Sequence, residues 1–97
     1  MGKLVTTAQD DLVVRRAHLL RLRFELVRLG VAVRVRRARQ GRLRLRIRHS
    51  GWSETVLCAG ADDAFAFVTA HGRLLGPAED ARVVARLLVW MAERRQR

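Results

Sequence analysis

The sequence predicts a single small α+β domain over residues 1–97. We expect an N-terminal helix, an antiparallel sheet of three to four strands, and a C-terminal helix packed on one face of that sheet. The first observation behind this prediction is a change of period: apolar residues follow a helical period before Gly30, alternate with polar ones after it, and return to the helical period at Pro77. The second is size, because 97 residues, 49% of them hydrophobic, suffice for only one modest core.

The first helix is expected from about Thr7 to Leu29, with Thr7 as its cap and Gly30 as its stop. Arg16 and Arg23 interrupt its apolar arc, which spans about 160° and is wider than one core requires. Either the Arg stems lie over the edge of the core, which is the simpler interpretation, or one flank of the arc contacts a partner. The arc consists of Leu12, Val13, Leu19, Leu20, Phe24, Leu26 and Val27.

A β-hairpin is the strongest structural signal in the sequence. Residues 31–36 alternate valine with alanine or arginine, and residues 42–48 alternate arginine with leucine or isoleucine. The segment 39–41 between them ends in Gly41 and predicts a turn. Because side chains alternate between the faces of a strand, this hairpin has one aliphatic face and one Arg face.

The second half of the chain predicts further strands and a closing helix. A turn is expected at 49–52 and a third strand over about 54–59. Residues 64–70 are compatible with a buried strand or a short helix, and their phenylalanines and β-branched residues favour a fourth strand. The last helix opens at 76–80, with Pro77 near its first position, and runs to about Arg95. Its expected core face is Val84, Leu87, Leu88 and Met91.

Charge is concentrated in one third of the chain. Twenty Lys and Arg against nine Asp and Glu give a net charge of +11, and the segment from Arg15 to Arg48 holds thirteen Arg with Glu25 as its one acid. Such a segment points to a polyanionic partner, although a solvated face in a GC-rich coding background explains the Arg bias about equally well. Like charges facing each other across a hairpin cost stability unless an anion compensates them. The candidate anion-binding residues are Arg34, Arg36, Arg42, Arg44, Arg46 and Arg48.

The residue types that usually carry catalysis or bind metals form no recognisable motif in this sequence. A single cysteine, Cys58, excludes an internal disulfide or a Cys-based zinc cluster, and we expect it to be a buried thiol. His18 is expected on the polar side of the first helix, and His49 and His71 in turns, with no metal-ligand spacing among them. The glycines form no phosphate loop. We therefore expect no enzyme, no cofactor, no metal site and no small-molecule substrate.

We expect neither a secretory signal nor a membrane-spanning helix in this sequence. Asp10 and Asp11 precede any apolar stretch, which is unlike a secretory signal, and no run approaches the ~18 apolar residues of a spanning helix. The expectation is a cytoplasmic protein that does not insert into a membrane. Contact with anionic lipid through the first helix is less favoured, because its Arg residues are spread round the helix.

The motifs SETVLC, at 53–58, and GPAED, at 76–80, carry a resemblance. The segment from Ser53 to Glu93 resembles a group of small actinobacterial proteins of uncharacterised function, which carry Trp-rich residues where this sequence has AFAFV at 64–68. The resemblance implies a regulatory accessory protein and assigns no functional residues. The order of elements is also similar to the double-stranded RNA-binding domain, but Glu79 and Asp80 stand where that domain presents a Lys cluster, so we reject that homology.

These patterns together predict a non-enzymatic regulatory or architectural protein. Its Arg-rich hairpin would contact a polyanion, the phosphates of DNA or RNA, in a salt-sensitive way, since no helix-turn-helix or zinc-finger spacing appears. The alternative is a protein–protein adaptor or homodimerisation module that binds an acidic protein, and a homo-oligomer is expected in either case. The residues expected to contact a protein partner are Leu12, Leu19, Leu26 and Trp90.

Overall fold

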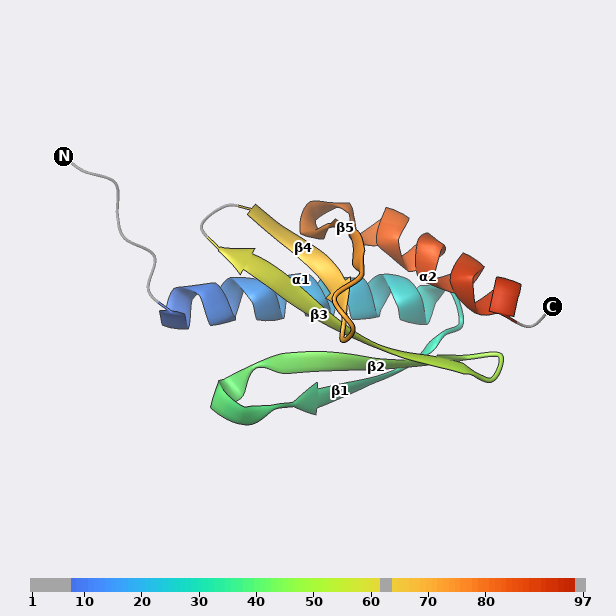
Figure 1. Cartoon of the computed structure of the whole chain (residues 1–97), viewed down its shortest axis with the longest axis horizontal. Coiled ribbons are helices and arrows are strands. Elements are labelled where there is room, and N and C mark those ends of the chain that lie inside the picture. Colours follow the sequence, from blue (N-terminus) through green and yellow to red (C-terminus); the bar gives the residue numbers. More distant parts are fainter. Residues whose placement is uncertain (1–7, 62–63, 96–97) are drawn as a thin grey trace.

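The computed structural model describes residues 8–61 and 64–95, and it has two terminal helices around one antiparallel sheet (Figure 1). The sheet order is β1-β2-β3-β4-β5, so every strand pairs with its neighbours in the sequence. This arrangement confirms the α+β class; the predicted cap Thr7 lies outside the described residues. The elements are α1 (Ala8–Arg28), β1 (Ala32–Arg37), β2 (Leu43–His49), β3 (Trp52–Ala61), β4 (Ala64–Thr69), β5 (Leu74–Pro77) and α2 (Ala81–Arg95), with short 3₁₀ turns at Arg39–Gly41 and Ala78–Asp80.

The sheet has five strands, and the prediction of three to four was wrong. The additional strand, β5, pairs with β4 across a bulge between Phe67 and Val68, where the sequence pattern indicated only the approach to a helix. Pro77 has no N–H group to donate, which an edge strand tolerates because one of its sides faces no neighbouring strand. Gly76 lets this short strand lie close to α2, since a Cβ there would be 3.0 Å from Cγ2 of Val84.

A two-residue turn sets the register of the sheet centre. Ser50 and Gly51 both have positive φ, 51° and 81°, as the hairpin turn of type I′ requires. The turn pairs His49 with Trp52 and thereby sets the partners on β3 of the preceding residues of β2, back to Leu45. Residues 64–69 form β4 and pair with β3, which confirms the strand interpretation of that segment.

The core lies between one face of the sheet and both helices. Its sheet side consists of alternate residues of β2, β3 and β4, with Leu45, Ile47 and Phe67 all fully buried. α1 contacts β1, β2 and β3, whereas α2 contacts β5, β3 and α1. Figure 1 shows β3 and β4 crossing in front of α1, with the β1–β2 hairpin below the helix and α2 beside it. Within residues 8–61 and 64–95, no helix therefore covers the opposite face of the sheet.

The apolar arc of α1 divides into two separate faces. Leu19, Leu22 and Leu26 are buried and form its core face, although Leu22 was not in the expected arc. The exposed members of that arc lie on the far side of the helix, beyond Arg16 and Arg23. The two arginines thus mark the boundary between a face that packs on the sheet and a face that does not.

The β1–β2 hairpin separates from the rest of the sheet at its turn end. β2 pairs with β3 only between Leu45 and His49, while β3 continues to Ala61 in partnership with β4 alone. Figure 1 shows β2 and β3 diverging toward the β1–β2 turn. At the far end of β3, Nη2 of Arg15 donates a hydrogen bond of 2.5 Å to the carbonyl oxygen of Gly60. The hairpin therefore projects its Arg face from the edge of the domain.

Candidate nucleic-acid interface

Arginines face each other across the two strands of the β1–β2 hairpin. Arg34 is opposite Arg46, and Arg36 is opposite Arg44. Directly opposed residues of an antiparallel pair have Cβ atoms about 4.5–5.5 Å apart, so the side chains leave the backbone as close like-charge pairs. They share the face opposite to that of Leu45, because successive residues of a strand point to opposite sides. The alternation seen in the sequence thus becomes two rows of cations.

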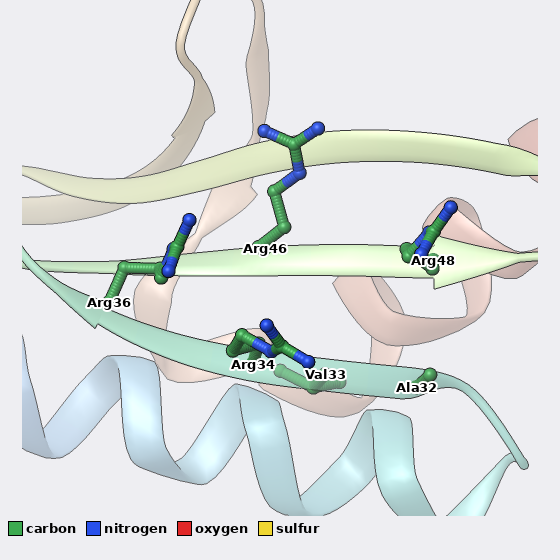
Figure 2. Close-up of a pocket in the computed structure, with 6 residues that line it drawn as sticks. All are labelled: Ala32, Val33, Arg34, Arg36, Arg46 and Arg48. Carbon is green, nitrogen blue, oxygen red and sulfur yellow. The ribbon is translucent and has the colours of Figure 1, made fainter.

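Four of these arginines line an open hollow on the surface of the hairpin. The hollow has a volume of about 480 Å³, and its charged walls come from Arg34 and Arg36 on β1 and from Arg46 and Arg48 on β2. Figure 2 shows the four side chains rising from the two neighbouring strands on the same side of the ribbon. Ala32 and Val33 complete its lining. The hollow is therefore a site where several guanidinium groups can reach a single anionic ligand.

No acid neutralises this cluster in the parts of the chain that the structure describes. The ion pairs there both involve Glu25, which lies on α1 and contacts Arg28 at 3.4 Å and Arg82 at 3.8 Å. Arg34 and Arg46 are exposed and have no carboxylate partner among the described residues. The repulsion between the cations is therefore left for solvent ions or a bound anion to offset.

Two hydroxyl side chains extend the cluster onto β3. The register places Thr55 opposite Arg46 and Ser53 opposite Arg48, on the same face of the sheet. Hydroxyl groups are common partners of phosphate oxygens, so they complement the guanidinium groups. Neither residue was predicted as part of the site, although the Ser50-Gly51 turn in the sequence fixes the register that places them there.

The remaining two candidate arginines lie differently from the four in the hollow. Arg44 is exposed at the end of the same face, opposite Arg36, and does not line the hollow. Arg42 precedes β2 and lines a different cavity, of about 130 Å³, together with Leu12 and Leu43. The structure thus brings five of the six arginines to one face of the hairpin and separates Arg42 from them.

The residues expected to contact a protein partner divide between core and surface. Leu19 and Leu26 are only 1% and 0% exposed, so they hold the domain together and leave no surface for a partner. Leu12 is half-buried, and Trp90 is exposed on α2, where the guanidinium of Arg94 lies 4.9 Å from its ring centroid. The exposed apolar surface of α1 consists instead of other members of the predicted arc, such as Phe24.

The histidines do not gather with other metal-binding side chains. Among residues 8–61 and 64–95, no group of three His, Cys, Asp or Glu side chains could hold a metal ion. His49 ends β2, and His71 lies in the turn before β5. His18 was expected on the polar side of its helix, yet it is half-buried, with its ring centroid 5.7 Å from that of Phe65. The correction follows from the position of β4, which the sequence could not place relative to the helix.

Cys58 is buried in β3, as the sequence predicted. Removal of the thiol from water raises its pKa from 9.0 to about 11, against a smaller lowering by the positive charge of Arg15. At pH 8 a rise of that size lowers the thiolate fraction by about 100-fold.

We expect Cys58 to react with iodoacetamide at pH 8 about 100-fold more slowly in the folded protein than in 8 M urea. Mass spectrometry of samples quenched over time measures both rates. Equal rates in the two conditions would show that the thiol is accessible and ionised in the native protein.

Comparison with known proteins adds no assignment to this geometry. The chain matches no protein-family model, no curated protein and no solved structure. None of the helices within residues 8–61 and 64–95 is long and apolar enough to cross a bilayer. The candidate interface therefore rests on the chain's own residues.

Proposed function

We propose that this domain is a non-enzymatic nucleic-acid-binding protein with a regulatory or architectural role in the cytoplasm. The observation that carries the proposal is the cluster of four arginines, Arg34, Arg36, Arg46 and Arg48, around one open hollow without a neutralising acid among the described residues. Guanidinium groups bind phosphate oxygens in a bidentate manner and remain charged at every physiological pH. The ligand of the hollow is the sugar–phosphate backbone.

The hairpin matches a backbone ligand better than it matches base edges. Successive arginines of one strand are two residues apart, which is about 6.6 Å along the strand, so each row presents repeated cations to a repeated anion. The exposed face of the hairpin carries no aromatic side chain on which a base could stack. We therefore propose binding that neutralises phosphates and discriminates little between sequences.

A salt series with a fluorescent 30-base-pair duplex tests this function. Four phosphate contacts predict that the logarithm of the association constant falls with the logarithm of salt concentration with a slope of about −3.6. Fluorescence anisotropy between 50 and 300 mM NaCl measures the slope, and a second duplex of unrelated sequence should give a similar value. Absence of binding at 50 mM NaCl would contradict the proposal.

The alternative ligand for the same face is an acidic protein. A competition with polyglutamate separates the two, because duplex DNA carries one charge per ≈ 1.7 Å of its axis and releases condensed counterions when they are displaced. We expect duplex DNA to be preferred at equal charge concentration. If polyglutamate displaces the duplex at equal or lower charge concentration, the adaptor function replaces nucleic-acid binding.

A further inference from the structure

α1 carries a second apolar row on the side away from the sheet. Phe24 and Val13 are 61% and 62% exposed, and Val27 and Leu20 are 53% and 38% exposed. Their spacing, with the exposed Ala17, alternates between four and three residues, which is the 3.5-residue period of a coiled-coil interface. We name this row the outer seam; it consists of Val13, Ala17, Leu20, Phe24 and Val27.

The outer seam is uncovered in the part of the chain that the structure describes. The helix contacts the sheet and α2 through its other side, where Leu19, Leu22 and Leu26 are buried. At 1.5 Å per residue the seam is about 21 Å long, the length of a docking site for a helix of four turns. A continuous apolar row of this kind on a small domain marks an interaction surface.

Arginines border the outer seam on both sides. Arg16 and Arg23 lie along one edge, and Arg21 and Arg28 lie along the other, as their places in the heptad require. The guanidinium carbon of Arg28 lies 5.9 Å from the ring centroid of Phe24, so cation and seam are in contact. Beyond Arg28, a hollow of about 160 Å³ between the helices is lined by Arg82 and Arg86 and by Glu25. Glu25 pairs with Arg28 and Arg82, so Arg86 is the cation that this hollow adds without an ion pair among the described residues.

These charges disfavour a second copy of the chain as the occupant. In a parallel pair of α1 helices, Arg16 would face Arg21 of the partner subunit, and Arg23 would face Arg28 of the partner subunit. In an antiparallel pair, Arg16 would face Arg23 of the partner subunit. Like-charge juxtaposition at a helical interface is destabilising, so both orientations are penalised.

We infer that the outer seam binds an acidic amphipathic helix of another protein. Apolar residues of that helix at a and d positions would pack on Leu20, Phe24 and their neighbours, while Glu or Asp at its flanking positions would pair with the four arginines. This site lies on α1 and is separate from the hairpin. The domain would then connect two ligands, a nucleic acid on the sheet and a protein on the helix.

A synthetic 21-residue peptide of three heptads, with Leu at a and d and Glu at e and g, is the probe. We expect isothermal titration calorimetry to detect binding of this peptide and not of two matched peptides. One has Lys in place of Glu, and the other has the acidic composition in scrambled order, so that it lacks an apolar stripe. Equal binding of the scrambled peptide would overturn the inference, because net charge alone would then explain the affinity.

Variants assign the binding to the outer seam. We expect each of the substitutions Phe24→Gln and Val27→Gln to lower the affinity for the acidic peptide by about tenfold or more, as is usual for central anchors of an interface. Val83→Gln is the matched control for Val27→Gln, since Val83 is 64% exposed on α2 and outside the seam. Circular dichroism checks that each variant is folded, and duplex binding of the same variants should be unchanged.

Two other results would place the peptide at a different site or assign a different occupant to the outer seam. If Phe24→Gln binds the peptide normally whereas Arg46→Glu does not, the peptide occupies the hairpin and the inference is wrong. If sedimentation equilibrium shows that the protein alone is a dimer and Phe24→Gln makes it a monomer, the seam binds a second copy. If the unmodified protein binds the peptide but not the duplex, the proposed function is wrong and this inference stands.

Discussion

Replacing Arg46 with glutamate is expected to weaken binding to duplex DNA by about 10- to 150-fold at 50 mM NaCl. Arg46 lies at the centre of the cluster, directly opposite Arg34 and diagonal to Arg36, and it lines the hollow. The lost contact is a charge-assisted hydrogen bond, which contributes about 1.5–3 kcal/mol. Glutamate also repels the phosphates, and the salt slope should become shallower by about 0.9 or more.

The same Arg46→Glu substitution is expected to stabilise the free domain. It replaces a like-charge cross-strand pair with an opposite-charge pair, a change worth about 0.2–1 kcal/mol. For a domain of this size we expect a rise in Tm of about 1–8 °C, measured by circular dichroism at low salt. A residue whose replacement improves stability while it removes binding is retained for its ligand and not for the fold.

Arg73→Glu is the control for charge. Arg73 is exposed in the connection between β4 and β5, so the substitution changes the net charge equally at a residue that belongs to neither strand of the hairpin and does not line the hollow. We expect it to weaken duplex binding by less than about threefold, through long-range electrostatics alone. If Arg73→Glu and Arg46→Glu weaken binding equally, the Arg cluster is not the contact site.

Replacing Phe67 with alanine is expected to cost about 3–5 kcal/mol of the free energy of unfolding. Phe67 is fully buried in β4, with Cys58 opposite it on β3 and Gly76 opposite it on β5. Its removal leaves a cavity at the centre of the core. Because a domain of 97 residues has a total stability of about 5–15 kcal/mol, the loss is a large fraction of the whole.

Phe24→Ala is the matched control for Phe67→Ala. The chemical change is identical, but Phe24 is 61% exposed on the outer seam, so we expect a loss of less than about 1 kcal/mol. Urea denaturation monitored by circular dichroism measures both values. Equal losses at the two positions would be incompatible with β4 as a central strand.

The sequence predicted the hairpin and its two faces because these depend on local patterns. Alternation with period two from Val31 to Ile47 identifies two strands, and Gly30 and Gly41 mark their ends. The same alternation places Arg34, Arg36, Arg44, Arg46 and Arg48 together on one face, as the structure has them. In the same way, the helical period of the apolar residues identified the two helices.

The sequence could not determine which apolar residues of α1 form the core. Leu22 and Phe24 are both large and apolar, yet one is fully buried and the other is exposed. An amphipathic helix with two apolar faces can pack through either of them, and the choice depends on the side to which the chain turns after Gly30. That information lies in the packing of the sheet and not in the helix.

Tertiary contacts also determine that residues 74–77 form a strand, β5. Leu74–Pro77 is too short to show a period, and Pro77 alone favours a helix start. Its pairing depends on the free edge of β4 and on the close approach of Gly76 to α2.

What the sequence determined by itself is therefore the class of the fold, the two-faced hairpin and the concentration of charge, each of which follows from residues close together in the chain. The tertiary structure alone decided how these parts meet. It placed Ser53 and Thr55 beside the Arg cluster, separated Arg42 from it, and left the outer seam of α1 uncovered by the other described residues. These relations join residues far apart in the chain, so they depend on strand register and helix packing rather than on local propensity.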